Sequence, residues 1–397
     1  MQLGLEVFLQ DSKRRKSLQK KRVALVCHPA SVDRNLHHAF DLVHEKIGLS
    51  CAFGPQHGVQ GEKQDNMIES DDFIHPRARI PIYSLYGRSR RPTPEMMANL
   101  DVMLFDLQDL GCRIYTFVTT LLYVMQACAE FQKKLIVLDR PNPIGNRVEG
   151  LRLEPGWESF VGAAPMPMRH GLTVGELALY YRDFFKLDFD LEIVKMRGYK
   201  AAQGWPSERV WVNPSPNAAN LNMARSYPGT VLLEGTELSE GRGTTRPLEL
   251  WGAPNLDIEK ILTAVAKLDL RGKLSVRTGV VLRPCFFEPT FHKHKQSLCS
   301  GLMWHYDTDS YSHKLAKPYR LMALTFKALR EVHPDLPLYR NFAYEYVEDR
   351  LAFDVINGGP TLREWIDDPR QKMVDLEQLL RRDEKSWEKE ISGIRLY

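Results

Sequence analysis

Carboxylate side chains follow short apolar runs at several points of this sequence. Asp106 and Asp109 come after the run at 102–105, and Glu234 comes after the run at 231–233. Hydrolysis of a glycosidic bond needs two carboxyl groups, one that protonates the leaving oxygen and one that acts at the anomeric carbon. Carboxylates at such positions also cap helices and fix loops, so each has a structural interpretation as well. The other carboxylates placed in this way are Glu62, Glu69, Asp139, Glu237 and Glu240.

Three arginines lie in the same polar segments and could bind an anionic substrate. Arg113, Arg140 and Arg242 each stand within a few residues of an Asp or Glu. A guanidinium binds a carboxylate through two parallel hydrogen bonds, so each arginine could hold a substrate carboxylate. Each could equally pair with a neighbouring acidic side chain. The sequence favours neither interpretation.

The elements that must position these residues form an α/β pattern. Each apolar run has the length of a buried strand and leads into a loop rich in Gly, Pro and polar residues. If the strands are parallel neighbours, these loops meet at one edge of the sheet, where ligands bind in open α/β folds. The sequence therefore predicts a parallel sheet with polar loops along one rim. The predicted strands cover residues 23–27, 49–53, 102–105, 135–138 and 231–233.

Local signals place two further segments. Thr173 and Glu176 form a capping box, in which each side chain satisfies a free backbone donor, and this predicts a helix from 173 to 185. His170 then lies just ahead of a helix N-terminus. Prolines at alternate positions before Asn217 exclude a central strand, so Asn217 is expected in a loop.

The pattern changes from about Leu256, and we predict two domains. Residues 1–245 hold the parallel sheet, which begins at about residue 21, and residues 246–397 form a smaller α+β auxiliary domain. A chain of 397 residues is long enough for both. The second domain is expected to contain helices at 258–268, 317–332 and 361–380 and a strand at 279–283.

Composition and charge exclude several classes of protein. The 54 basic and 50 acidic residues leave a net charge of +4, which is too small to indicate nucleic-acid binding. No run of 18 apolar residues predicts a membrane span, and the charged first 22 residues do not resemble a signal peptide. The six cysteines form no Cys-x-x-Cys pair and fit a reducing compartment, so we expect a cytoplasmic protein.

The usual motifs for nucleotides and metals are also missing from the sequence. Neither common Gly-rich phosphate loop occurs, and there is no Gly-x-Ser-x-Gly elbow. His292, His294 and His305 do not stand at the spacing of a zinc site. We therefore expect no metal and no other cofactor.

Seven ordered motifs together resemble the exo-acting β-N-acetylmuramidase family (NamZ-like), over nearly the whole chain from about Lys21. The resemblance implies a Rossmann-like N-terminal domain without a nucleotide, an auxiliary C-terminal domain and an active cleft between them. It further implies hydrolysis that releases N-acetylmuramic acid (MurNAc) from the non-reducing end of peptide-free cell-wall fragments. The motifs are Gly54-Pro55-Gln56-His57-Gly58, Asp106-Leu107-Gln108-Asp109-Leu110-Gly111-Cys112-Arg113-Ile114-Tyr115-Thr116, Asp139-Arg140-Pro141-Asn142-Pro143, Ser159-Phe160-Val161-Gly162, His170-Gly171-Leu172-Thr173, Pro214-Ser215-Pro216-Asn217, and Glu234-Gly235-Thr236 through Ser239-Glu240-Gly241-Arg242-Gly243-Thr244.

Such a small carbohydrate suits the residues in these motifs. An arginine would bind its lactyl carboxylate, amide and imidazole groups its hydroxyls, and the ring of Tyr115 or Trp251 a sugar face. The substrate-binding residues that we expect are Gln56, His57, Asp106, Arg113, Tyr115, Arg140, Asn142, His170, Asn217, Glu240 and Arg242.

One departure from the family pattern concerns the acid. Many members resemble Ser-Pro-Glu-His-Gly at the first motif, and that glutamate is a strong candidate for the catalytic acid, whereas this chain has Gln56. Glutamine cannot carry the proton. We expect Glu62, on the same loop, to be the acid, with Asp109 and Glu234 as partners, one as the second carboxylate and the other orienting.

Two other functions stay open at this point. The chain could be an amino-sugar-binding protein that kept the cleft and lost the acid. It could also be a metal-dependent hydrolase, which would need ligands that converge around His57 and His170. The sequence sets neither the oligomeric state nor the choice between retention and inversion, because the latter depends on the distance between two carboxylates.

Overall fold

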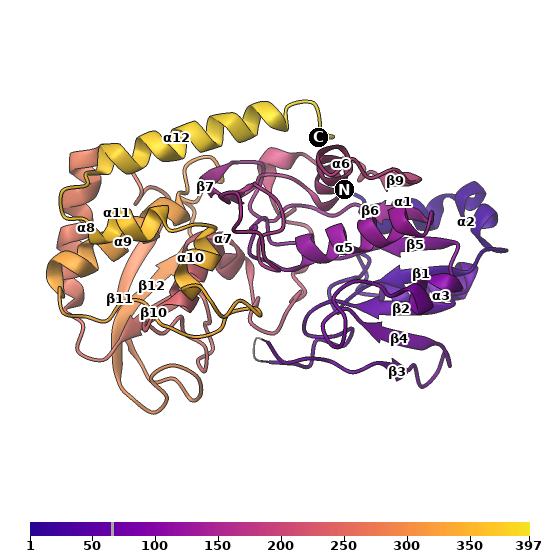
Figure 1. The fold of residues 1–397 in the computed structure, drawn as a ribbon, viewed down its shortest axis with the longest axis horizontal. Helices are drawn as coiled ribbons and strands as arrows, with labels where there is room; N and C mark the ends of the chain where they lie inside the picture. The colour runs from indigo at the N-terminus through magenta and orange to yellow at the C-terminus, as the bar shows by residue number, and fades with distance from the viewer. Residues whose placement is uncertain (65–66) are drawn as a thin grey trace.

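The fold is built around a seven-stranded sheet, on the right of Figure 1. The computed structural model describes residues 1–64 and 67–397. The strand order is β3-β4-β2-β1-β5-β6-β9, and all neighbours are parallel except β3 and β4. The predicted α/β class with a mainly parallel sheet is confirmed. The strands are β1 (Val23–Val26), β2 (Cys51–Gly54), β3 (Phe73–Ile74), β4 (Pro81–Ser84), β5 (Val102–Phe105), β6 (Lys134–Leu138) and β9 (Leu191–Val194).

Helices cover both faces of this sheet. Along β1, Val23 and Leu25 belong to one buried apolar cluster and Ala24 and Val26 to another, because successive side chains of a strand point to opposite faces. Helices α1 and α3 contribute to the first cluster, and α5 and α6 to the second. The sheet is therefore the middle of three layers. The helices of this domain are α1 (Gly4–Gln10), α2 (Ser12–Leu18), α3 (Ala39–Ile47), α4 (Pro94–Ala98), α5 (Phe117–Glu130) and α6 (Val174–Phe184).

The chain between β6 and α6 makes a long polar excursion. It passes through a two-stranded antiparallel sheet of β7 (Glu149–Arg152) and β8 (Pro167–Arg169). The capping box of Thr173 and Glu176 then opens α6, as predicted. A short 3₁₀ helix, η1 (Ala201–Gln203), follows β9, and residues 211–217 form a loop, which was also predicted.

A second domain, on the left of Figure 1, combines helices with a three-stranded antiparallel sheet in the order β10-β12-β11. One buried cluster runs without a break from Phe105 and Leu121 in the first domain to Trp251 and Leu324 in the second. The shared core holds the facing loops in fixed positions. The elements are α7 (Leu221–Thr230), η2 (Val231–Gly235), β10 (Leu250–Ala253), α8 (Ile258–Gly272), β11 (Val281–Phe287), β12 (Cys299–His305), α9 (Pro318–Val332), α10 (Ala352–Asn357), α11 (Thr361–Asp367) and α12 (Met373–Glu390).

Two predicted elements were wrong. The apolar run at 231–233 is not a strand but the 3₁₀ helix η2, which continues α7 and is buried all round. A fully buried helical turn has the same apolar pattern as a buried strand. The helix predicted at 361–380 is two helices, α11 and α12, and the break contains Pro369, whose ring cannot continue a helix.

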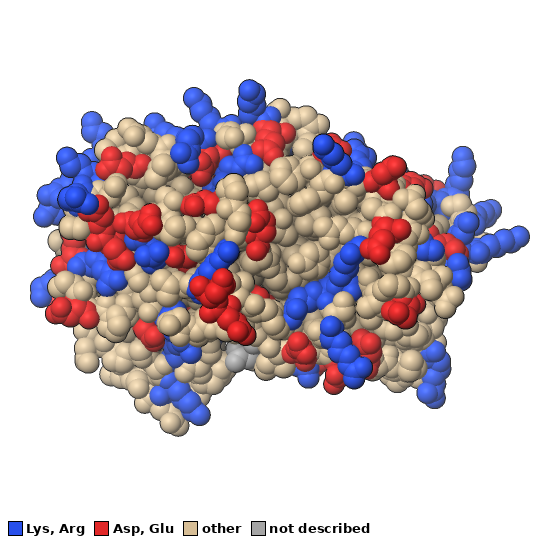
Figure 2. All heavy atoms as spheres, viewed as in Figure 1, with Lys and Arg blue, Asp and Glu red and all other residues tan. Residues whose placement is uncertain are grey.

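The C-terminal tail returns to the first domain, so that the two chain ends lie near each other in Figure 1. The Tyr397 hydroxyl donates to Asp139 Oδ2 at 2.7 Å, and the Leu396 amide donates to Glu176 Oε1 at 2.7 Å. Figure 2 shows positive and negative side chains intermixed over one face of the molecule, as the small net charge predicts. Among the helices of residues 1–64 and 67–397, none is long and apolar enough to span a bilayer.

Candidate active site

A small cavity of about 40 Å³ lies where loops of the first domain meet segments of the second. Carboxylate, amide, guanidinium and tyrosine side chains line its wall together with apolar ones. The structure brings six of the predicted site residues to this wall: Gln56, His57, Tyr115, Asn217, Glu234 and Arg242.

Glu234 is buried and lies on the cavity wall in contact with two donors. Arg242 Nη2 donates to Glu234 Oε1 at 2.8 Å, and the Tyr344 hydroxyl donates to Glu234 Oε2 at 2.7 Å. Burial alone would lower the pKa of Arg242, but Glu234 and Glu240 outweigh it and raise that pKa. The guanidinium therefore stays charged and balances the negative charge of Glu234.

A second carboxylate of the cavity, Glu345, is one that sequence reasoning missed. It contacts the first motif: Gln56 Nε2 donates to Glu345 Oε1 at 3.0 Å, and the Tyr86 hydroxyl donates to Glu345 Oε2 at 2.8 Å. Burial raises the pKa of Glu345 above its usual value, and the bonds from Tyr86 and Gln56 offset part of this rise. The cavity thus holds two buried carboxylates in different surroundings.

The rest of the cavity wall is suited to a polar ligand with apolar faces. The Tyr115 and Tyr227 rings meet edge to face, with centroids 6.2 Å apart. His57 Nδ1 contacts the Lys63 carbonyl at 2.7 Å, and Asn217 Nδ2 donates to the Gln64 carbonyl at 2.8 Å. The loop at 63–64 therefore fixes both side chains. Sequence reasoning also missed the wall residues Thr116, Ser215, Tyr227, Tyr344 and Glu345.

Asp106 and Arg140, which we expected to bind substrate, bind each other in the structure. Arg140 Nε and Nη2 donate to the two oxygens of Asp106 at 2.6 and 2.8 Å, and both side chains are almost fully buried. Neither is among the described residues that line the cavity. The alternative interpretation of Arg140, pairing with a neighbouring acidic side chain, is the correct one.

Asp109, Asn142 and His170 also hold loops rather than face the cavity. Asp109 Oδ2 accepts from the Gly111 amide at 2.6 Å and contacts His170 Nε2 at 3.2 Å. The other ring nitrogen of His170 accepts from the Leu172 amide. Asn142 donates to the Leu172 carbonyl at 3.0 Å. The structure therefore does not support catalysis by Asp109 or substrate binding by Asn142 and His170.

Arg113 and Glu240 are not among the described residues that line the cavity, and both are bonded to neighbouring groups. Arg113 donates to the carbonyls of Met166 at 2.9 Å and Asn357 at 2.6 Å, which joins the two domains. Burial lowers the pKa of Arg113 to about 10. Glu240 contacts Lys293 Nζ at 2.7 Å and Arg242 Nε at 3.1 Å. Burial alone would raise the pKa of Glu240. The effect of burial is outweighed by three neighbouring side chains, Lys293, His292 and Arg242, which hold the pKa of Glu240 well below its usual range.

Glu62, the predicted acid, lies at the surface. Its side chain is 49% exposed, its nearest cation is Lys63 Nζ at 4.0 Å, and it is not among the described residues of the cavity wall. The ring of Trp251, the alternative to Tyr115, is buried within β10 and likewise does not line the cavity.

Glu345 was missed because no apolar run precedes it. It stands between two tyrosines, in the turn closed by the bonds between Tyr344 and Val347 at 3.1 and 3.0 Å. The signal that could have found it is this pair of aromatic neighbours in a segment without regular structure, since polar groups held by aromatic side chains are typical of binding sites.

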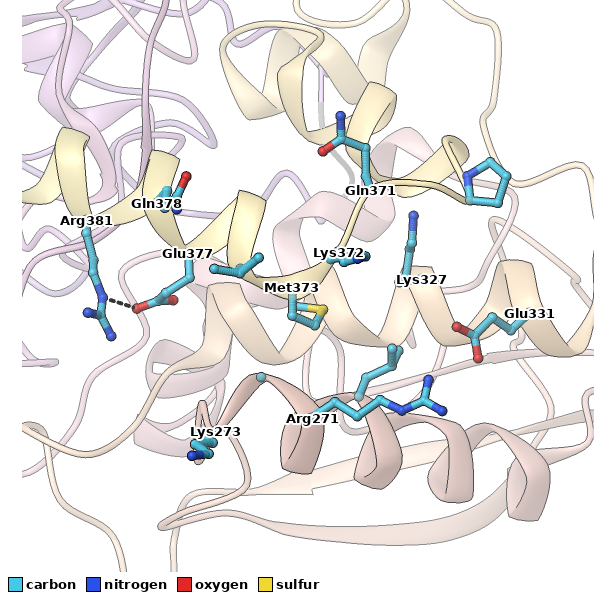
Figure 3. A pocket seen from close by; sticks show the side chains of 14 residues that line it. Arg271, Lys273, Lys327, Glu331, Gln371, Lys372, Met373, Glu377, Gln378 and Arg381 are labelled. Atoms are coloured by element: carbon cyan, nitrogen blue, oxygen red, sulfur yellow. Dashed lines mark hydrogen bonds and ion pairs between the residues drawn. The ribbon is translucent and has the colours of Figure 1, made fainter.

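A larger groove lies elsewhere, and it is lined by different residues. The groove of about 800 Å³ runs between α8, α9 and α12 in the second domain (Figure 3). Arg271, Lys273 and Lys372 on its wall are exposed, and Lys327 donates to main-chain carbonyls, including that of Asp368. All of the predicted site residues belong to the described part of the chain, and none of them lines this groove. We therefore assign the candidate active site to the smaller cavity.

Metal ligands do not converge at either place. Across residues 1–64 and 67–397, no group of three or more His, Cys, Asp or Glu side chains is arranged to hold a metal ion. His57 lies on the cavity wall, whereas His170 is bonded to Asp109 behind it. The arrangement that a metal-dependent hydrolase requires is therefore missing from the described residues.

The fold and the cavity together define a two-domain α/β protein with paired buried carboxylates in a cavity between its domains. The chain belongs to the exo-β-N-acetylmuramidase NamZ family, because the model of the family's N-terminal domain matches residues 23–222 and that of its C-terminal domain matches residues 225–397. This confirms the resemblance inferred from the seven motifs.

Individual relatives support the same assignment. A peptidoglycan β-N-acetylmuramidase NamZ from Bacillus subtilis (strain 168) is 42% identical over 306 residues, which are 76% of this chain and 72% of that protein. Two crystal structures of DUF1343 family proteins from Bacteroides fragilis NCTC 9343 are also similar, and each covers 100% of this chain and 98% of its own. One has a TM-score of 0.83 at 30% identity, and the other a TM-score of 0.74 at 25% identity.

Proposed function

We propose that this protein is a glycoside hydrolase that releases MurNAc from the non-reducing end of peptidoglycan-derived fragments. The observation that carries the proposal is the pair of buried carboxylates, Glu234 and Glu345, on the wall of one cavity. Glycosidases use two carboxyl groups whose surroundings differ, so that one holds a proton and the other a negative charge. Glu345, whose pKa burial raises, and Glu234, which pairs with Arg242, meet this requirement.

Arg242 is the residue that we assign to the lactyl carboxylate of MurNAc. Its Nε and Nη2 atoms bond Glu240 and Glu234, while its buried Nη1 atom has no hydrogen-bond partner among the residues that the structure describes. A buried donor of this kind favours an anionic partner. The Asn217 amide and the Tyr115 ring on the same wall suit the hydroxyl groups and one face of a sugar.

Non-catalytic binding of amino sugars is the second candidate function. Gln56 favours it, because an amide stands where many family members carry a glutamate. The same wall would then bind MurNAc without cleaving it. The two carboxylates on the wall of one cavity favour the enzyme, since glycoside hydrolysis uses two such groups.

We also propose that the protein acts in the cytoplasm, on wall fragments that the cell recycles. All six cysteines are unpaired in the structure, and five of them are buried. Free thiols are typical of reducing compartments. Fractionation of cells followed by immunoblotting tests this proposal, and recovery of the protein outside the cytoplasmic fraction would contradict it.

Incubation with two disaccharides tests the proposed activity. MurNAc-β-1,4-GlcNAc presents MurNAc at the non-reducing end, and GlcNAc-β-1,4-MurNAc is the matched control with the order reversed. We expect MurNAc and GlcNAc from the first substrate and no cleavage of the second, with the products measured by liquid chromatography and mass spectrometry. If the first disaccharide is bound in calorimetry but stays intact, the binding protein is the correct alternative.

A further inference from the structure

The position of the missing acid is occupied by an amide that contacts a carboxylate from the other domain. Gln56 Nε2 donates to Glu345 Oε1 at 3.0 Å, while Gln56 Oε1 accepts from the Thr116 hydroxyl at 2.7 Å. These two bonds set which end of the amide faces Glu345. A glutamate at position 56 would instead put two carboxyl groups about 3 Å apart, where both cannot be ionised. The amide therefore suits a single carboxyl group at Glu345.

The surroundings of Glu345 favour a proton on that carboxyl group. Glu345 is 4% exposed and lies on the cavity wall together with Glu234. Burial raises the pKa of Glu345, and the negative charge of Glu234 raises it further. Glu234 differs because it has a cation, Arg242, at 2.8 Å. The two carboxyl groups of the cavity are thus separated into one that keeps a proton more easily and one whose charge is balanced.

The backbone at Glu345 is held in an uncommon conformation. Glu345 and Tyr346 have φ angles of 45° and 70°, in the left-handed region that residues with a side chain seldom adopt. Tyr346 is fixed by the Arg90 guanidinium, 3.3 Å from its ring centroid, and by Glu69, which accepts from its hydroxyl at 3.2 Å. Such conformations persist where the surroundings enforce them, and they cluster at functional sites.

We propose that Glu345 is the proton donor of this protein and that Gln56 positions it, so that the second domain supplies the acid which the first motif lacks. This inference rests on the proposed glycosidase function. Glu345 does not follow an apolar run, so it was not among the carboxylates that the sequence indicated. Glu234 then acts at the anomeric carbon, as nucleophile, base or electrostatic partner.

The reaction is balanced without another reactant. The carboxyl proton of Glu345 passes to the glycosidic oxygen while the bond between that oxygen and the anomeric carbon breaks, and the bonding electron pair leaves with the oxygen. Water supplies the hydroxyl group that the anomeric carbon gains. The remaining proton of that water restores the acid, directly or through a carboxylate of the cavity.

Two substrates with different leaving groups test this role. The natural disaccharide needs a proton on its leaving oxygen, whereas 2,4-dinitrophenyl β-MurNAc releases a stable phenolate without one. For Glu345→Gln we expect kcat/KM to fall about 10²- to 10⁴-fold on the disaccharide and less than about tenfold on the dinitrophenyl glycoside. The exchange variant Gln56→Glu/Glu345→Gln keeps one amide and one carboxyl group in contact and should recover at least about tenfold on the disaccharide.

Tyr86→Phe supplies a second measurement that does not remove the acid. The Tyr86 hydroxyl donates to Glu345 and favours its ionised form, so its loss should raise the pKa of Glu345. Activity needs the protonated acid, and the alkaline limb of kcat/KM should therefore move to higher pH. A merely structural role of Glu345 would lower activity at every pH and leave the limb in place.

The possible outcomes separate the two proposals. Equal losses on both substrates in Glu345→Gln, or an unchanged alkaline limb in Tyr86→Phe, would overturn the role of Glu345 while the glycosidase function stands. A parent protein that is inactive on both substrates would overturn the glycosidase function and this inference with it. A large loss on the disaccharide alone supports both.

Discussion

Two buried polar clusters of this protein look alike in the sequence and differ in the structure. The scaffold cluster follows β5, β6 and β8 in the first domain and consists of Asp106, Asp109, Arg140, Asn142 and His170. The cavity cluster joins the two domains and consists of Gln56, Glu234, Arg242, Tyr344 and Glu345. Both contain carboxylates, and both come partly from segments that follow apolar runs.

The two clusters differ in whether their polar groups bond one another or face a cavity. In the scaffold cluster the arginine and the imidazole are bonded to carboxylates or main-chain groups of neighbouring loops. In the cavity cluster every member lies on the wall of one cavity, and Arg242 keeps a donor without a partner among the described residues. Buried polar groups that satisfy one another stabilise a fold, whereas groups that face a cavity can bind and react.

The largest effect should follow from changing Glu234 in the cavity cluster. For Glu234→Gln we expect kcat/KM on the MurNAc disaccharide to fall about 10²- to 10⁴-fold, because the second carboxylate of the reaction is lost. Stability should change little, since Arg242 still pairs with Glu240 at 3.1 Å. Steady-state kinetics and thermal unfolding measure the two quantities.

Glu237→Gln is the matched control for this change. Glu237 stands three residues further along and is not among the described residues of the cavity wall. It should leave kcat/KM within about twofold of the parent, as surface changes usually do. Similar losses in the two variants would show that the loop as a whole, and not the Glu234 carboxylate, carries the effect.

Asp106→Asn in the scaffold cluster should have the opposite result. It leaves the buried Arg140 charge without its anionic partner, and loss of one member of a buried pair lowers the free energy of unfolding by about 3 kcal/mol. Urea unfolding measures this. The folded fraction should keep kcat/KM within about threefold, because the pair does not line the cavity.

Asp101→Asn is the control for Asp106→Asn. Asp101 pairs with Arg22 at 2.7 Å, but both side chains are partly exposed, so its loss should matter much less. If Asp106→Asn abolished activity at full stability, the scaffold cluster would belong to the active site.

The fold was predictable because its signals are local. Apolar runs such as 102–105 and the capping box at Thr173 depend on neighbouring residues, and the structure has them as predicted. The roles of the polar residues depend on tertiary contacts. Asp106 and Glu234 both follow apolar runs, yet one meets Arg140 behind the loops and the other lies on the cavity wall.

The contact between Glu345 and Gln56 could not be predicted from the sequence for the same reason. It joins residues 289 positions apart, and nothing near either residue indicates it. The sequence favours Glu62 as the acid, because a loop brings together residues that are close in sequence, such as Gln56 and Glu62. The packing of the second domain instead places Glu345 beside Gln56.

Asp139, a buried carboxylate of the first domain, should make a smaller contribution to stability that depends on pH. It accepts from the Arg140 and Gly175 amides and from the Thr173 and Tyr397 hydroxyls, and burial nevertheless raises its pKa to about 7. Because the folded pKa lies above the unfolded value near 4, the contribution of Asp139 to stability should be greatest below pH 4 and decline as the pH rises toward 7. This decline should level off above pH 7, where the group is ionised in both states.

Asp139→Asn should remove that decline. An asparagine can accept from the two amides and donate to the two hydroxyls, which keeps the contacts. We expect a gain in the free energy of unfolding on the order of 1 to 3 kcal/mol at pH 8 relative to the parent, and little difference at pH 4. Urea unfolding at both pH values measures it, and a parallel shift at both would exclude titration of Asp139.

Glu62→Gln should have the smallest effect, and it is the most direct comparison of sequence with structure. Glu62 is the acid that the loop motif predicts, whereas the structure leaves its side chain 49% exposed and outside the cavity wall. A side chain that does not line the cavity makes no contact with the reacting groups, so kcat/KM and stability should stay within about twofold and about 0.5 kcal/mol of the parent. Steady-state kinetics of Glu62→Gln and Glu345→Gln, measured under the same conditions, tests this. A loss of 100-fold or more in Glu62→Gln would return the acid to the first loop, and the bond between Gln56 and Glu345 would then be a structural contact between the domains.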